Sequence, residues 1–237
     1  WNQEGVKNMS AHPDADFEIL CNFDAQGVEV TPLGSVATPF TGTFDGQGHT
    51  IKGLKVTERH DGAQAALFGS IAGTSEFKNV VIDEACIKYP ANGKDYYAAS
   101  IVGTLYGTHV FENITVKNST ITGNNKVGAI FAHDGRGTQI TINNCHVDSC
   151  YIASEDTVDG GCVGGLIGYY ETGVAGKPNT ISNSSVKNST IVGINSTNSG
   201  KRANSEFIGS ILTKDEMVLN IVDCVVENND FSQTTDG

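Results

Sequence analysis

The sequence predicts an all-β fold, a right-handed parallel β-helix (a solenoid) of about five to seven coils with an atypical N-terminal cap. An apolar pattern recurs along the chain, and its strand patches are only four to six residues long, bounded by Gly, Asn, Ser and Thr. The loops between the patches absorb every difference in repeat length. Short β-branched patches between turn formers are typical of strands rather than helices.

The repeat is clearest in five segments that align without a gap. Large apolar residues occupy the first, sixth and eleventh positions, and the third position is Asn in four segments and Asp in the last. The pattern recurs every 31 to 40 residues. The segments are Phe77–Ile82, Phe111–Val116, Ile142–Val147, Ile181–Val186 and Ile221–Val226, and their eleventh positions are Ile87, Ile121, Ile152, Ile191 and Phe231.

A second, shorter apolar element precedes each segment. These elements are Ala66–Gly69, Ser100–Gly103, Ala129–Ala132, Gly165–Gly168 and Glu206–Gly209. Because both elements recur in the same order, stacking strand on strand at roughly 4.8 Å places equivalent residues in columns inside the solenoid. The Asn at the third position suits a bend, since Asn tolerates left-handed backbone geometry. A leucine-rich repeat needs a more regular Leu frame, and an immunoglobulin-like sandwich needs strands every 8 to 12 residues or so, which disfavours both.

The N-terminal region differs from the repeats. Segments 17–24 and 28–30 are expected to be entry strands, within a cap that covers residues 1–45. The repeat coils then fill residues 46–237, and we expect residues 1–237 to form one β-helix domain. The chain begins at Trp1 without a Met, and no segment obviously covers its last coil, so we expect it to be part of a longer protein.

The charge of the chain disfavours two classes of partner. The net charge is −12 and the sequence pI is about 4.8. An acidic surface repels phosphate backbones and anionic membranes, so no nucleic-acid partner is expected. No apolar run approaches the roughly 20 residues that span a bilayer, so we expect no membrane insertion by this segment. The sequence does not indicate an oligomeric state.

Two segments carry a family resemblance. Gly165-Leu166-Ile167-Gly168 resembles the short motif that names the GLUG repeat family, and the run from Phe40 to Leu54 resembles the opening coil of bacterial surface β-helix proteins. This resemblance implies an exported, adhesin-like bacterial protein that is extracellular or bound to the cell surface. The family supplies no catalytic residues to transfer to this chain.

Six cysteines are spread through the chain. The register places Cys145, Cys150 and Cys224 where small inward residues belong, so we interpret these three as core thiols. Cys145 and Cys224 share a column but lie two coils apart, roughly 10 Å, which exceeds the reach of a disulfide. A pair among Cys21, Cys86 and Cys162 stays open. A zinc site at Cys145-His146 and Cys150 is disfavoured, because alternation turns His146 away from the core.

One acidic loop is a second candidate metal site. Glu155, Asp156 and Asp159 precede Gly160-Gly161, and hard oxygen ligands suit Ca²⁺. The ordinary interpretation is a solvated acidic loop, because the residues match neither an EF-hand nor a nonapeptide calcium repeat. No other cofactor is expected.

Two polar groups resemble parts of an active site. His133 and Arg136 follow a core strand, and Tyr169 shares a column with His133 in the next coil. Glycoside hydrolysis needs two facing carboxylates, and lyases generally use Arg or Lys with Ca²⁺. The column of His133 instead contains Ser70, Thr104 and Ser210, so catalysis remains the alternative. Asp45 and His49 are interpreted as turn residues.

Tyrosines at strand ends suggest a carbohydrate ligand. An amphipathic ring can stack on a sugar while its hydroxyl stays wet. The candidate binding residues are Tyr96, Tyr97, Tyr106, Tyr169 and Tyr170. Six glycosylation-like sequons also occur, but several fall at equal repeat positions, so the repeat itself explains them.

These observations favour a non-catalytic, extracellular bacterial surface module for adhesion or ligand binding. Its expected partner is a host or microbial surface glycan or protein. Variable loops projecting from a rigid solenoid suit such binding, and the longest span residues 88–100, 153–165 and 192–206. Two alternatives stay open: a polysaccharide lyase or glycoside hydrolase with its site at His133, Arg136 and Tyr169, and a structural stalk.

Overall fold

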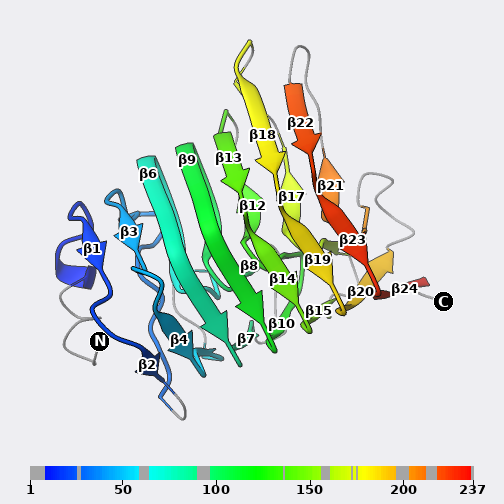
Figure 1. Ribbon diagram of the computed structural model, residues 1–237, viewed down its shortest axis with the longest axis horizontal. Coiled ribbons are helices and arrows are strands. Elements are labelled where there is room, and N and C mark those ends of the chain that lie inside the picture. The colour runs from blue at the N-terminus through cyan, green and yellow to red at the C-terminus, as the bar shows by residue number, and fades with distance from the viewer. Residues whose placement is uncertain are drawn as a thin grey trace.

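The computed structural model describes residues 9–25, 28–58, 64–89, 97–135, 137–155, 161–171, 173–174, 176–195, 203–211 and 218–235. Across these residues the chain is nearly all β, with one short helical turn at residues 9–11. Every strand pairing among these residues is parallel, as the aligned arrows of Figure 1 show. Long parallel sheets built from a repeated segment are compatible with the expected parallel β-helix.

The strands form three sheets. The first sheet contains β1 (Phe17–Glu18), β2 (Phe23–Asp24), β3 (Phe44–Asp45), β4 (Thr50–Lys52), β6 (Phe68–Asp83), β9 (Val102–Lys117), β12 (Phe131–Asp134), β13 (Gln139–Asn143), β14 (His146–Asp148), β17 (Ile167–Tyr170), β18 (Pro178–Ser182), β19 (Ser185–Lys187), β21 (Ile208–Ile211), β22 (Val218–Val222) and β23 (Val225–Glu227). The second contains β5 (Lys55–Val56), β7 (Cys86–Lys88), β10 (Thr120–Gly123), β15 (Tyr151–Ser154), β20 (Thr190–Asn195) and β24 (Asp230–Thr235). The third contains β8 (Tyr97–Ala98), β11 (Lys126–Val127) and β16 (Cys162–Val163).

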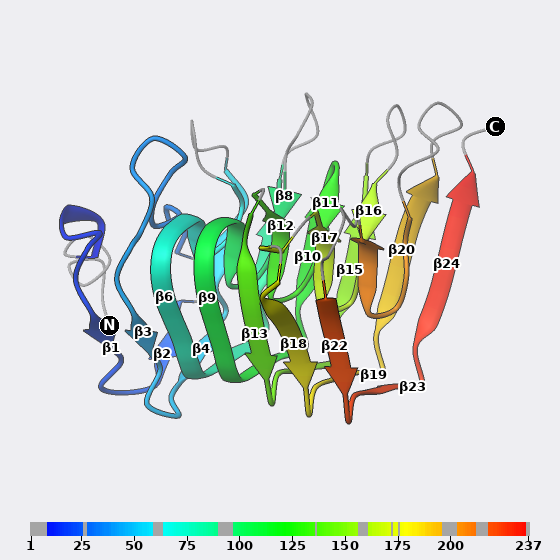
Figure 2. The same cartoon turned by 90° about the horizontal axis from the view of Figure 1, so that it is seen from above.

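Each coil is one passage of the chain through these sheets. The coils stack along the long axis, so that the N-terminal and C-terminal residues lie at opposite ends (Figures 1 and 2). The second sheet, with β20 and β24 at its C-terminal end, lies across the core from β18 and β22 (Figure 2). None of the helical residues described forms a helix long and apolar enough to cross a membrane.

The predicted columns are confirmed. One column aligns Phe17, Phe44, Phe77, Phe111, Ile142, Ile181 and Ile221. A second aligns Ile87, Ile121, Ile152, Ile191 and Phe231 in the second sheet. The residues from Phe44 to Ile181 in the first column are almost fully buried. Because each side chain covers the equivalent one in the next coil, the repeat builds a continuous core.

Phenylalanine rings fill the N-terminal half of this core. Neighbouring rings have centroids 4.9 to 6.2 Å apart, which is the range of favourable aromatic pairing. The rings belong to Phe17, Phe40, Phe44, Phe68, Phe77, Phe111 and Phe131. The later coils replace them with Ile and Val, so the core is aromatic at one end and aliphatic at the other.

Two corners of the coil are held by residues with positive φ. Their φ values lie between 50° and 56°. One column contains Asn79, Asn113, Asn144, Asn183 and Asp223, and the other contains Glu84, Asn118, Ser149, Asn188 and Asn228. Left-handed geometry costs most residues roughly 1–2 kcal/mol, and Asn is among those that adopt it most readily. The bend therefore explains the recurring Asn at the third position, and four of the sequons begin at these corner residues.

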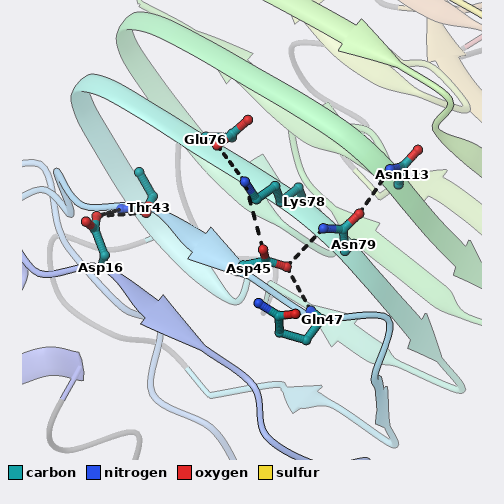
Figure 3. Close-up of polar contacts among 8 residues, drawn as sticks. All are labelled: Asp16, Thr43, Asp45, Gln47, Glu76, Lys78, Asn79 and Asn113. Carbon is teal, nitrogen blue, oxygen red and sulfur yellow. Dashed lines mark hydrogen bonds and ion pairs between the residues drawn. The ribbon is translucent and has the colours of Figure 1, made fainter.

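The first corner also forms a hydrogen-bonded ladder between coils (Figure 3). Asn79 donates to the Asp45 carboxylate at 3.0 Å, Asn113 donates to Asn79 at 3.0 Å, and Asn144 donates to Asn113 at 2.8 Å. Asp45 also accepts from the backbone of Gln47 at 2.8 Å. Asp45 is therefore the first acceptor of the ladder, which confirms its interpretation as a turn residue.

Short strands occupy the N-terminal end. β1 pairs with β3 and β2 pairs with β4. The backbones of Glu29 and Lys55 form an isolated parallel β-bridge. The Asp16 carboxylate accepts hydrogen bonds from the backbone N–H of Thr43 at 2.9 Å and from its hydroxyl at 2.7 Å (Figure 3). These hydrogen bonds lower the pKa of Asp16. The two expected entry segments are thus added to the first coil in the same parallel sense. That residues 1–45 act as a cap stays a prediction.

The C-terminal coil leaves part of the apolar core open. Within the described chain, no strand pairs with the outer edges of β22, β23 and β24. The apolar side chains there are 41 to 49% exposed, whereas Tyr170, Ile181 and Val186, which precede Ile211, Ile221 and Val226 in register, are fully buried. The exposed side chains belong to Ile211, Val218, Ile221, Val222, Val225 and Val226.

The cysteines follow the predicted register. Cys145 and Cys150 are buried, Cys224 is half-buried in the last coil, and none of the six cysteines forms a disulfide. Burial raises the pKa of Cys145 to about 12 and that of Cys150 to about 11. Such thiols stay protonated and are inert core residues. His146 faces away from the core and bonds Ser185 at 2.9 Å, as alternation predicted.

The asparagine ladder gives the first prediction. Replacing Asn113 by Ala removes one donated and one accepted hydrogen bond and places a β-carbon in a left-handed corner. We expect the free energy of unfolding to fall by about 2 kcal/mol, measured by urea denaturation. Asn113→Gly keeps the backbone geometry and should lose about half as much. Equal stability of both variants and the parent would contradict the role given to this corner.

Candidate functional site

The strongest candidate site lies at an outer corner where the third sheet meets the first. In this corner the backbones of neighbouring coils are in direct contact at glycine residues. A β-carbon added to Gly168 would lie 2.7 Å from both the Val127 nitrogen and the Ala132 oxygen, and one added to Gly128 would lie 2.4 Å from the Gly168 nitrogen. Only a residue without a side chain permits this approach, which explains the glycines of the Gly-Leu-Ile-Gly element.

Two walls meet at this corner. One wall consists of β8 and β11, which bring Tyr97 and Lys126 side by side in register. The other consists of β12 and β17, which bring His133 and Tyr169 side by side. The strands of the two walls are in direct contact. Side chains from three successive coils therefore meet on the outside of the solenoid.

The aromatic rings of the two walls are in contact. The Tyr97 and His133 rings have centroids 4.8 Å apart, and the His133 and Tyr169 rings have centroids 5.6 Å apart with an interplanar angle of 29°. Tyr97 is nearly buried, whereas His133 and Tyr169 are partly exposed. Tyr97 thus lies on the inner side of the cluster, and the ring of Tyr169 is accessible to solvent.

Lys126 holds this cluster together. Its Nζ atom lies 4.4 Å from the centroid of Tyr97 and 4.8 Å from that of Tyr169, and it donates to the Tyr97 hydroxyl at 3.1 Å. A cation over an aromatic face contributes about 0.5–2 kcal/mol. Sequence reasoning missed this residue, because a single Lys before an inward Val has no distinctive pattern. Only the contact between the walls reveals it.

His133 is neutral at physiological pH. Burial lowers its pKa from 6.5 to about 3, and the charge of Lys126 lowers it further. Its Nδ1 atom is buried and has no hydrogen-bond partner among the described residues. A neutral imidazole can donate from one nitrogen and accept at the other, but with this pKa it is a weak general base at neutral pH.

Tyr106 extends the cluster along the first sheet. Its ring lies against Gly135, two residues from His133, where an added β-carbon would meet the ring at 2.0 Å. The Tyr106 side chain is 39% exposed. Tyr97, Tyr106, Lys126, His133 and Tyr169 are called the corner cluster below.

Other predicted residues fall elsewhere. The expectation that Tyr170 binds a ligand is corrected by the structure. Its ring is fully buried, and its hydroxyl donates to the Thr138 carbonyl at 3.3 Å. Burial raises the pKa of Tyr170. The strand alternates at this point, so Tyr169 faces outward and Tyr170 faces inward. Tyr96 and Arg136 lie outside the described residues.

The acidic loop gains no support as a metal site. Glu155 pairs with Lys88 at 3.2 Å, while Asp156 and Asp159 lie outside the described residues. Within the described ranges, no three His, Cys, Asp or Glu side chains form a group that could hold a metal ion.

Among the described residues, the corner does not bring together two facing carboxylates. Asp134, the carboxylate next to His133, is fully buried and accepts a hydrogen bond from the backbone of Glu171. Hydrolysis of a glycoside requires two carboxylates that face the scissile bond. Within the described part of the chain, His133 is instead flanked by two tyrosine rings and the charge of Lys126, which suit binding better than proton transfer.

Comparison with known proteins gives two similarities. No protein-family model matches the chain. Halomucin from Haloquadratum walsbyi is 27% identical over 154 residues, which is 62% of this chain and 2% of halomucin, so the chain matches only a small part of that protein. A crystal structure described as a "putative immunoglobulin A1 protease" from Bacteroides ovatus has a TM-score of 0.64 at 18% identity, covering 98% of this chain and 75% of the other. The structural similarity shows a shared fold.

The close approach at the corner gives the second prediction. Gly168→Ala would press its β-carbon against the backbone of β11 and should lower the free energy of unfolding by about 1–3 kcal/mol. Ala132 occupies the equivalent column position and already fits, so Ala132→Gly should cost less than about 1 kcal/mol. Urea denaturation of both variants tests this difference. Equal losses would mean that the glycines do not set the distance between the walls.

The buried histidines give the third prediction. Burial lowers the pKa of His109 to about 4 and that of His133 to about 3, from 6.5. Between these values and 6.5 the unfolded chain binds protons that the folded chain does not, so stability falls as the pH falls. Each histidine contributes a slope of up to about 1.4 kcal/mol per pH unit.

Thermal or urea unfolding between pH 7 and about pH 4.5 measures this slope. The double variant His109→Gln/His133→Gln should have a shallower slope than the parent. His12→Gln is the matched control, since His12 is exposed, and it should keep the parent slope. An unchanged slope in the double variant would contradict the neutral state of the two buried rings.

Proposed function

We propose that this chain is a non-catalytic, extracellular module of a bacterial surface protein that binds a ligand and mediates adhesion. The observation that carries the proposal is the corner cluster, in which partly exposed aromatic and cationic side chains converge on a rigid parallel scaffold. Aromatic residues with a few placed polar groups are typical of binding sites. The partner is a surface glycan or a surface protein.

The same proposal includes the finer description of the fold. We assign the coils to a right-handed parallel β-helix of the GLUG-motif type. Support comes from Gly165 to Gly168, whose glycines permit the close approach of neighbouring coils, and from the parallel register. Right-handed connections are strongly preferred between parallel strands of one sheet.

One similarity supports a location outside the cell. Immunoglobulin A1 is a secreted antibody, so a protease that acts on it would work outside the bacterium, and the structural neighbour carries that description. Shared fold at 18% identity transfers no proteolytic activity to this chain.

The fourth prediction tests the module as a whole. Immobilised protein should retain ligands from a glycan array or bind whole microbial or epithelial cells, and it should release neither reducing sugar nor unsaturated product from polysaccharides. Turnover that is abolished by His133→Ala would establish the enzymatic alternative. Absence of binding to every glycan and cell surface would favour the structural stalk.

A further inference from the structure

The corner cluster has an arrangement that suits one class of ligand. Its accessible rings belong to Tyr106 and Tyr169, which come from two different coils on the same outer face. Aromatic rings bind pyranose sugars through the apolar C–H face of the sugar, while the tyrosine hydroxyl remains in water. Rings on separate coils offer separate sugar positions along the solenoid axis.

The spacing of these positions is set by the backbone. Successive coils rise by roughly 4.8 Å, which is comparable to the length of one pyranose in an extended, equatorially linked chain. The ring of His133 lies between the coils of Tyr106 and Tyr169, stacked on Tyr169 at 5.6 Å. Tyr106 lies two residues along the strand from the column that contains His133 and Tyr169. An extended glycan that crosses the coils obliquely would therefore meet one ring or polar group per coil.

Polar groups for sugar hydroxyls lie beside the rings. The ammonium group of Lys126 is within 5 Å of both Tyr97 and Tyr169, and an ammonium carries three donors. The Nδ1 atom of His133 has no hydrogen-bond partner in the described part of the chain. A buried polar nitrogen without a partner is unfavourable, so a sugar hydroxyl that reached it would supply the missing hydrogen bond.

The overall charge selects against acidic glycans. The chain has a net charge of −12, which repels polyanions at long range. The charge of Lys126 is also directed at two aromatic faces. A neutral glycan avoids the long-range repulsion and still uses the rings.

We propose that the corner cluster binds a neutral glycan of equatorially linked pyranoses, laid obliquely across the coils over Tyr106, His133 and Tyr169 and hydrogen-bonded by Lys126. This inference rests on the proposed binding function and names its ligand class and site. Tyr97 is a positioning residue, because it is nearly buried and holds Lys126 through its hydroxyl.

The fifth prediction is tested by isothermal titration with cellohexaose, xylohexaose and mannohexaose, and with oligogalacturonate as the acidic comparison. We expect at least one neutral hexaose to bind and the acidic chain to bind more weakly. Tyr169→Ala and Tyr106→Ala should each weaken binding about tenfold, which corresponds to about 1.4 kcal/mol for a lost stacking contact. Tyr169→Phe keeps the ring and should retain most of the affinity.

Two controls separate binding from folding. Tyr151→Ala removes a tyrosine that is 43% exposed on β15 of the second sheet, and it should bind like the parent. Lys187→Gln removes a lysine that pairs with Glu227, whereas Lys126→Gln removes the corner donor and should weaken binding. Far-UV circular dichroism and thermal unfolding establish that each variant is folded.

Three outcomes would overturn the inference. They are an absence of binding to every neutral hexaose, tighter binding of oligogalacturonate than of the neutral chains, and neutral binding that survives Tyr169→Ala and Tyr106→Ala. In each case the broader proposal stands if the protein still binds cells or other glycans. Failure of those broader assays overturns both.

Discussion

Parallel hydrogen bonding between successive coils is the interaction on which the rest of the structure depends. It fixes the rise from coil to coil and therefore aligns equivalent residues over the whole length of the chain. The apolar columns, the asparagine ladder and the glycine contacts all follow from this alignment. The structural role of a residue therefore depends on the equivalent residues in the preceding and following coils.

Most of the fold could be predicted from the sequence because residues that stack in one column recur at the same position of each repeat. The columns of Phe77 and Ile87, the corner at Asn79 and the buried thiols of Cys145 and Cys150 all occupy their expected places. One prediction was wrong at a single residue, because Tyr170 was expected to face solvent. Tyr169 and Tyr170 are adjacent, and only the direction of the strand decides which of them faces solvent.

The candidate site could be predicted only in part. The shared column of His133 and Tyr169 was visible in the repeat, but their contact with Tyr97 and Lys126 was not. That contact depends on the close approach of the first and third sheets, which the absence of side chains at Gly128 and Gly168 permits. Residues first considered separately as catalytic or sugar-binding candidates thus belong to one cluster.

The spacing of the coils can be measured directly with pairs of spin labels in the column of the second sheet that runs from Lys55 through Cys86, Thr120, Tyr151 and Thr190 to Asp230. Labels are attached to introduced cysteines, after the exposed Cys21 and Cys86 are replaced by serine. Parallel stacking predicts backbone separations of roughly 14, 19 and 24 Å from Lys55 to Tyr151, Thr190 and Asp230, a constant increment of about 4.8 Å per coil. Separations that do not increase by this step from pair to pair would contradict the stacked-coil structure.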